Sequence, residues 1–220
     1  MSNAVIQLLV LAAVAIFLIL RLKNVLGTRD GFEKPVKPVV LPDDKPARRS
    51  FEVIDGGADR DIIDHVPEGS DAARALAAMK QVEPKFSVNE FLQGARGAYE
   101  MILMAFERGD LEKVRAFLAP EVYDAFDQVV ETRATQGLKV QADFLGLREL
   151  ALHDAHFDRT SGEAEVTVRF MGELVSVARN AAGDVVEGDP KASRKQRDVW
   201  TFARKMGSAD PNWQLVATGG

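Results

Sequence analysis

An uncharged run at the N-terminus constrains this chain more than any other feature. Residues 4–20 read AVIQLLVLAAVAIFLIL, and Gln7 is their only polar side chain. A helix on the surface of a globular domain would carry a polar stripe with a period of about 3.6 residues, and this run has none. Extended to Leu22 it spans about 19 residues, or roughly 28 Å of helix, close to the ~30 Å hydrocarbon core of a bilayer. The run therefore predicts a transmembrane helix.

The flanking residues favour a permanent anchor over a cleaved signal peptide. No basic residue precedes the run, and no small-residue cleavage site follows it. A cleaved signal and a buried helix are the two alternatives. Arg21, Lys23 and Arg29 follow the run closely, and basic residues stay on the cytoplasmic side. This predicts a single-pass protein of the inner (cytoplasmic) membrane, or of the equivalent organellar membrane, with its C-terminal domain in the cytoplasm.

Composition limits the chemistry and the partners of the chain. Its 220 residues carry a formal net charge of -5 and contain no cysteine, which excludes disulfides and thiol catalysis. Residues 21–50 hold eight basic and four acidic side chains, whereas residues 51–71 hold one basic and seven acidic side chains. The basic part lies beside the predicted anchor, where anionic lipid headgroups attract Lys and Arg. We expect contact with the inner membrane and anionic lipid and none with nucleic acid; a tether that contacts only water is the alternative.

Three parts are predicted: an anchor (residues 1–26), a flexible tether (27–71) and a folded domain (72–220). Five of the nine prolines fall in the tether, together with several glycines, and such a composition buries too little apolar surface to fold. Short apolar groups interrupt its acidic half, within residues 51–54 and 62–66. These groups are expected to dock on the domain, on a neighbouring molecule, or on nothing.

Helical periodicity dominates the first half of the domain. Ser87 and Glu90 form a capping box, and Phe86 and Phe91 form the matching hydrophobic staple. Ser70 is the predicted N-cap of the first helix, and Asp110 is the predicted N-cap of a short helix further on. The predicted helices cover residues 70–82, 87–109, 110–118 and 120–137.

The period then changes from 3.6 to 2. Apolar and polar residues alternate strictly between Glu163 and Leu174, which predicts a half-buried strand, and Gly172 within it predicts a bulge or bend. Further strands are predicted at residues 147–157, 197–204 and 213–217. Helices followed by an antiparallel meander define an α+β domain.

Two stretches of sequence resemble a known family. One is the exit from the anchor, residues 17–33; the other comprises Asp198-Val199-Trp200-Thr201-Phe202 and Pro211-Asn212-Trp213-Gln214-Leu215. Both are similar to bacterial members of the family of subunit forty-four of the mitochondrial inner-membrane import translocase. The order of elements also resembles the cone-shaped, nuclear transport factor two-like fold, in which helices pack inside a curved antiparallel sheet.

The resemblance implies a domain that contacts acidic lipid and membrane or translocating proteins. In that family an N-terminal part also recruits the chaperone of the import motor, and the tether of this chain is too short to contain such a part.

No catalytic motif accompanies this pattern. Walker, dinucleotide, nucleophile-elbow and zinc spacings are missing from the sequence, so we expect no cofactor and no metal. His153 and His156 lie three apart on a predicted strand, which favours edge histidines over a metal pair. A pocket enzyme that uses a buried carboxylate, at Asp143, Asp154 or Asp198, is one alternative function. A structural scaffold is another, although the anchor has no Gly-xxx-Gly pair that would indicate an oligomeric state.

The predicted functional site is apolar. Helical and strand residues are expected to line the inside of the cone, either as plain core or as an open pocket for an acyl chain or an apolar peptide side chain. Trp200 is expected to contact a partner or the membrane if it faces outward. The predicted pocket residues are Tyr99, Leu103, Phe126, Phe170, Trp200 and Phe202. The leading hypothesis is a non-enzymatic, membrane-tethered binding module.

Overall fold

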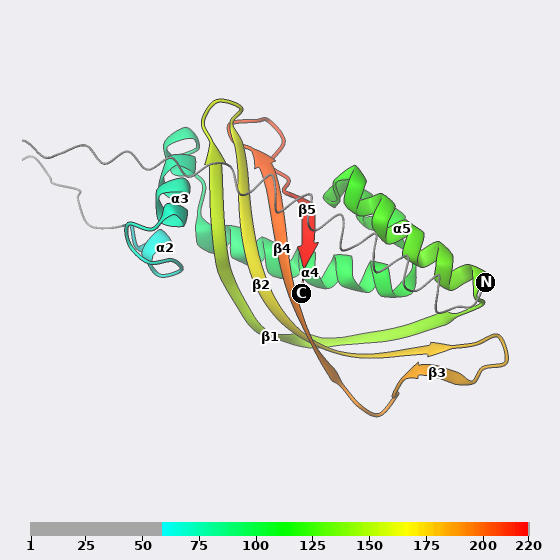
Figure 1. Ribbon diagram of the computed structural model, residues 1–220. Coiled ribbons are helices and arrows are strands. Elements are labelled where there is room, and N and C mark those ends of the chain that lie inside the picture. Colours follow the sequence, from blue (N-terminus) through cyan, green and yellow to red (C-terminus); the bar gives the residue numbers. More distant parts are fainter. Residues whose placement is uncertain (1–58, 220) are drawn as a thin grey trace, which may run out of the picture. The chain divides into compact units, whose positions relative to one another are not determined.

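The computed structural model describes residues 59–219 (Figure 1). The predicted anchor, with Arg21, Lys23 and Arg29, and most of the predicted tether lie outside the described residues. Within residues 59–219, no helix is both long enough and apolar enough to cross a membrane. The N-terminal anchor and its orientation therefore stay predictions.

Helices form the first half of the described chain. Ser70 caps α3 through a 3.1 Å hydrogen bond from the Ala73 N–H, and Ser87 Oγ accepts a 3.3 Å bond from the Glu90 N–H at the start of α4. Both predicted caps are confirmed. The helices are α2 (Arg60–Ile63), α3 (Asp71–Val82), α4 (Val88–Arg108), the 3₁₀ helix η1 (Leu111–Phe117) and α5 (Pro120–Thr135).

Asp110 stands at the N-cap of η1, as predicted, but it does not make the expected capping hydrogen bond. Its side chain accepts no hydrogen bond from the start of η1 and instead pairs with Lys113. In a 3₁₀ helix residues three apart lie nearly above one another, so the ammonium group competes with the backbone for the carboxylate.

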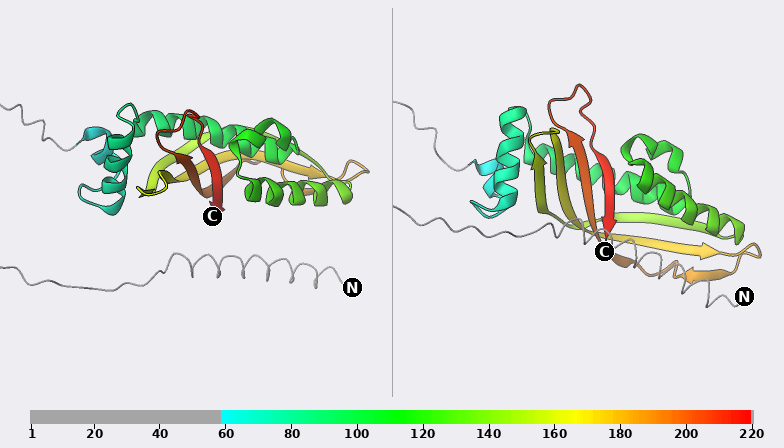
Figure 2. Two further views of the ribbon diagram at one scale, coloured as in Figure 1. Left: turned by 90° about the horizontal axis from the view of Figure 1, so that it is seen from above. Right: turned by 45° about the horizontal axis from the view of Figure 1, so that its top comes forward.

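A bent, five-stranded antiparallel sheet forms the second half. Its strand order is β1-β2-β4-β5, with β3 beside the far end of β2. Three register irregularities along β1 accompany the bend, and α4 runs across the inner face of the sheet (Figures 1 and 2). The strands are β1 (Lys139–Asp158), β2 (Glu163–Arg179), β3 (Val185–Gly188), β4 (Arg194–Lys205) and β5 (Gln214–Gly219).

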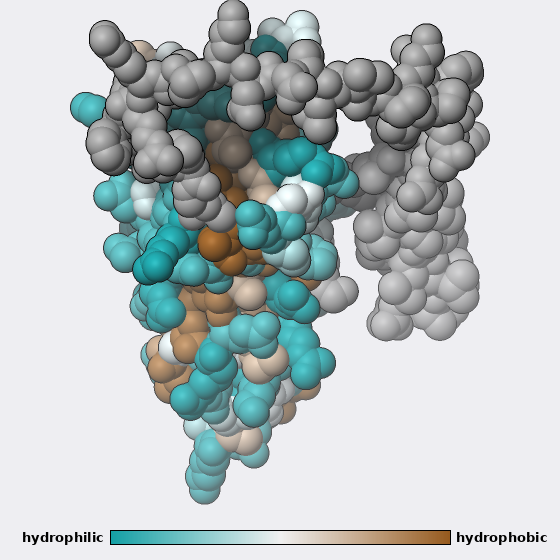
Figure 3. All heavy atoms as spheres, turned by 90° about the vertical axis from the view of Figure 1, so that its left-hand side faces the viewer, coloured by the Kyte–Doolittle hydropathy of each residue, from teal (hydrophilic) through white to brown (hydrophobic). Residues whose placement is uncertain are grey.

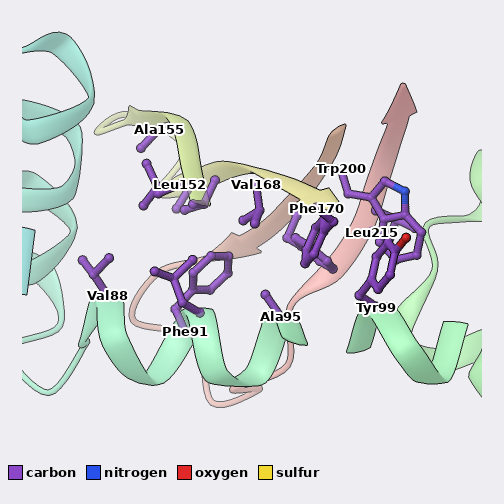
Figure 4. Packing of buried hydrophobic residues seen from close by; sticks show 14 of the residues in the cluster. Val88, Phe91, Ala95, Tyr99, Leu152, Ala155, Val168, Phe170, Trp200 and Leu215 are labelled. Atoms are coloured by element: carbon purple, nitrogen blue, oxygen red, sulfur yellow. The ribbon is translucent and has the colours of Figure 1, made fainter. Parts of the chain in front are cut away.

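Alternate residues of β2 build the core against α4. Val166, Val168 and Phe170 are all 0% exposed, as the strict alternation predicts. Trp200 lies opposite Val168 in the register, on the same face, so its side chain points inward at 3% exposure (Figure 4). The alternative of an outward-facing Trp200 is excluded.

Several strands differ from their predicted extents. β2 continues to Arg179 rather than ending near Leu174, and β4 begins at Arg194 rather than Arg197. β1 begins at Lys139 rather than near Leu147. Val140, Ala142 and Phe144 alternate with polar residues, but the register irregularities after Phe144 separate this alternation from that of the predicted strand at residues 147–157. The short strand β3 was not predicted, since all four of its residues are exposed and carry no apolar alternation.

The folded unit includes part of the predicted tether. Ile62 on α2 and Val66 after it are 4% and 6% exposed and belong to the same core as α4 and the sheet. The apolar group at residues 62–66 therefore docks on the domain.

Candidate functional site

An apolar groove of about 340 Å³ opens between the start of α4, the end of β4 and the connection from β4 to β5. We call it the aromatic groove. Charged residues from both sides also line it, among them Glu83, Lys85, Glu90 and Arg204. Figure 3 views the domain from the end that carries α2 and α3, where hydrophobic surface appears between hydrophilic flanks. The aromatic lining consists of Phe86, Phe91, Phe117, Phe202 and Trp213.

Trp213 is the centre of this aromatic lining. Its ring centroid lies 4.8 Å from that of Phe91 and 6.0 Å from that of Phe86, the two residues of the hydrophobic staple. Asp210 Oδ1 accepts hydrogen bonds of 2.9 Å and 2.8 Å from the backbone and side chain of Asn212, which shapes the turn that presents the indole. The staple and the turn thus place three aromatic rings together at one end of α4.

A partly buried ion pair lies beside the indole. Arg204 Nη2 donates to Glu83 Oε2 at 2.8 Å, and the Arg204 side chain is only 7% exposed. Its guanidinium lies 5.3 Å from the centre of the Trp213 ring. The hydrogen bond from Arg204 lowers the pKa of the Glu83 carboxyl below its ordinary value. Arg204 Nε is buried and has no hydrogen-bond partner within residues 59–219.

Asp61 secures the wall of the groove at the N-terminus of α4. Its carboxylate accepts hydrogen bonds from the Val88 N–H at 2.8 Å, the Asn89 N–H at 3.0 Å and Ser87 Oγ at 3.1 Å, and pairs with Lys80 at 2.7 Å. Burial alone would raise the pKa of Asp61, but these hydrogen bonds outweigh it and hold the pKa well below its ordinary value. A residue of the predicted tether therefore anchors a helix that lines the groove.

The predicted pocket residues occupy two different places. Tyr99 stacks on Phe170 with ring centroids 4.5 Å apart and lies 4.7 Å from Trp200, all within the buried core. Leu103 is also buried, at 3% exposure. Phe126 is half-buried on α5 and packs against Phe106, 4.7 Å away. Of the six, only Phe202 reaches the aromatic groove.

The groove brings together residues that belong to separate features of the sequence. Phe86 and Phe91 form the predicted staple, and Trp213 belongs to the family-like stretch. No pattern in the sequence links the staple to Trp213. The connection is the β4–β5 pairing, in which Ala203 lies opposite Gln214 and brings the adjoining Trp213 toward α4. The predicted strands at residues 197–204 and 213–217 could have indicated this contact, because two such strands pair as a hairpin.

The carboxylates proposed as a catalytic base are placed as follows. Asp198 accepts a 2.6 Å hydrogen bond from the Tyr99 hydroxyl and a 3.2 Å bond from Gln196 Nε2, so both of its oxygens are engaged. Burial and this hydrogen bond raise the pKa of Tyr99 above its ordinary value. Asp143 and Asp154 are exposed, as are His153 and His156. Among residues 59–219, no group of three potential ligands could hold a metal ion.

These features define an α+β domain with a ligand-sized apolar groove at one end of its central helix. The Tim44-like domain family matches residues 72–220, and the chain belongs to this family. A human protein, "Mitochondrial import inner membrane translocase subunit TIM44", is 23% identical over 160 residues, which is 71% of this chain and 35% of that protein. The rat protein of the same name is 22% identical over the same shares of the two chains. The chain thus spans about a third of the length of these relatives.

The likeness to solved structures is weaker. The intermembrane space region of the chloroplast protein ARC6 is 12% identical, covering 58% of this chain and 94% of that one, with a TM-score of 0.39. This score is too low to carry an argument about function.

Proposed function

We propose that this chain is a non-enzymatic binding module of the inner membrane, and that its aromatic groove holds apolar side chains of a membrane or translocating protein. The observation that carries the proposal is the groove itself, in which Trp213, Phe91 and Phe202 line about 340 Å³ of space. Membership of the Tim44-like family supports it, because the named relatives are import translocase subunits.

The size and polarity of the groove favour a protein segment over a lipid chain. Ligand sites range from about 300 to 1,000 Å³, so this groove is at the small end and suits one or two side chains. Arg204 is a largely buried donor at the groove, and Lys85 and Glu90 also line it. A peptide carries backbone carbonyl and N–H groups along its whole length that can pair with such residues, whereas the hydrocarbon part of an acyl chain has none.

The contacts of Asp198 support a binding role over the alternative of a pocket enzyme. A general base must lie within hydrogen-bond reach of the proton that it takes from a substrate. Here the Tyr99 hydroxyl and Gln196 Nε2 already donate to the two oxygens of Asp198, and Asp198 is not among the residues that line the aromatic groove.

The membrane part of the proposal rests on the sequence. The anchor at residues 4–20 and the basic residues Arg21, Lys23 and Arg29 support a single-pass protein with a cytoplasmic domain and contact with anionic lipid. The curved sheet also supports assigning the domain to the nuclear transport factor two-like, cone-shaped folds.

Peptide binding to the full chain in lipid nanodiscs tests the groove. The probe is a 12-residue peptide with a Phe- and Leu-rich centre, charged residues at its ends for solubility and a fluorescent label whose anisotropy reports binding, with an unlabelled fatty acid as competitor. Gly94 lines the groove and has nothing within 4 Å of a built Cβ, so Gly94→Leu should fill it and weaken peptide binding at least about fivefold. Gly97→Leu, at an equally open site on α4 that does not line the groove, is the matched control.

Unchanged peptide affinity in Gly94→Leu would contradict the proposal. Displacement of the peptide by the fatty acid at low concentration would instead identify an acyl-chain site, the second of the two predicted ligands.

A further inference from the structure

We propose that the chain's own segment Phe51–Ile54 docks in the aromatic groove and competes there with the protein segment. This inference rests on the proposed function and names a regulator of the same site. The segment lies just outside the described residues and contains Phe51, Val53 and Ile54, with Glu52 among them and Asp55 directly after.

The chain enters the domain at the groove. Asp61 Oδ1 lies 3.1 Å from Ser87 Oγ, and Ser87 lines the groove. The segment precedes Asp61 by seven to ten residues, which can reach roughly 23–33 Å at about 3.3 Å per residue. Because Asp61 contacts a residue that lines the groove, a chain of this reach is long enough to place Phe51 in it.

The proposed contact continues one that the structure shows. Ile62 and Val66 belong to the same acidic stretch and are buried in the core, while Asp61 and Asp59 pair with Lys80 beside them. Apart from the half-buried Ile63, the other large apolar side chains of this stretch are those of Phe51–Ile54, and they have the same pattern of apolar side chains between carboxylates.

The chemistry of the groove suits this occupant. Phe51 would add an aromatic ring to a lining of aromatic rings, and such pairs stabilise beyond simple burial of area. Lys85 lines the groove and forms no ion pair within residues 59–219, which suits Glu52 or Asp55. A tethered segment also acts at a millimolar effective concentration, so a weak intrinsic affinity is sufficient for occupancy.

Disulfide cross-linking of the full chain in mild detergent tests the docking directly, because the chain has no cysteine of its own. Glu52→Cys keeps the apolar residues and is paired with Gly94→Cys in the groove. The control pairs Glu52→Cys with Arg96→Cys, two residues further along α4 and about 200° around the helix. We expect the 52–94 bridge to form at least about tenfold faster than the 52–96 bridge. Adding Phe51→Ser and Ile54→Ser should slow it to the control rate.

Peptide binding separates this inference from the proposed function. With an effective concentration of ~5 mM and an intrinsic Kd of ~1 mM, removing the segment's apolar side chains should tighten peptide binding about sixfold. The inference would be overturned if the 52–94 and 52–96 bridges formed at equal rates and the peptide bound equally well with and without the segment's apolar side chains. The proposed function would then remain intact. Fast cross-linking that depends on Phe51, with no peptide binding to either form, would support the docking and remove the proposed function.

Discussion

Gly172 is the position where one added methyl group should be most informative. A Cβ built on it would lie 2.7 Å from the Tyr99 hydroxyl oxygen, 3.1 Å from Tyr99 Cε1 and 3.3 Å from Phe144 Cε2. Tyr99 cannot move away freely, since it is 0% exposed, stacks on Phe170 and donates a 2.6 Å hydrogen bond to Asp198. Overpacking costs about 1–3 kcal/mol, and a lost hydrogen bond adds about 0.5–1.5 kcal/mol. Gly172→Ala should therefore lower the free energy of unfolding by about 2–4 kcal/mol.

A double-mutant cycle identifies the cause. Tyr99→Phe removes the atom nearest to the added methyl group, although it leaves Asp198 without its phenol donor. The combined variant should be less destabilised than the sum of the two single variants, by about 1 kcal/mol or more. The assay is urea denaturation of residues 59–220 followed by circular dichroism. A cost of Gly172→Ala below about 0.5 kcal/mol, or a strictly additive cycle, would refute the close packing described above.

Three further predictions follow from other positions. Leu103→Ala should cost about 2–5 kcal/mol in the same denaturation assay, because Leu103 is 3% exposed; a cost below about 1 kcal/mol would indicate an open pocket around it. Asp61 has a folded-state pKa below its ordinary value of 3.8, so its carboxylate stabilises the fold above pH 3.8 and this stabilisation is lost as the pH falls below it. In Asp61→Asn, the free energy of unfolding should therefore decrease less between pH 5 and pH 2 than in the unmodified chain. A reporter active only in the periplasm should stay silent when fused after Gly220, and three lysines inserted before Val5 should activate it; a strong signal from the unmodified chain would reverse the predicted topology.

Local chemistry explains why the helices were easy to predict. The signals for α3 and α4 lie within a few residues of each helix end, such as Ser70 before α3 and the Ser87–Glu90 pair of α4. The alternation along β2 was equally readable, because one face packs on α4 and the other contacts solvent. Family membership could also be predicted, since the stretch around Trp213 lies within the matched residues 72–220.

The groove and the start of the folded unit could not be predicted in this way. Both depend on contacts between residues far apart in the chain, such as Asp61 with Ser87 and Phe91 with Trp213. The acidic stretch has the composition of a tether, yet two buried apolar side chains and the capping carboxylate of Asp61 hold part of it on the domain. The average composition of a stretch does not show which of its residues make contacts with the folded domain.

The two halves of α4 differ in a way that points to one end of the domain. In the C-terminal half, polar contacts engage the helix with the sheet: Tyr99 bonds to Asp198, and the buried Glu107 accepts bonds from Ser176 at 2.8 Å and Arg194 at 3.2 Å. The N-terminal half instead lines the apolar groove. The chain enters at this same end, through the contact of Asp61 with α4. The groove, the N-terminal half of α4 and the start of the described chain therefore lie at the same end of the domain.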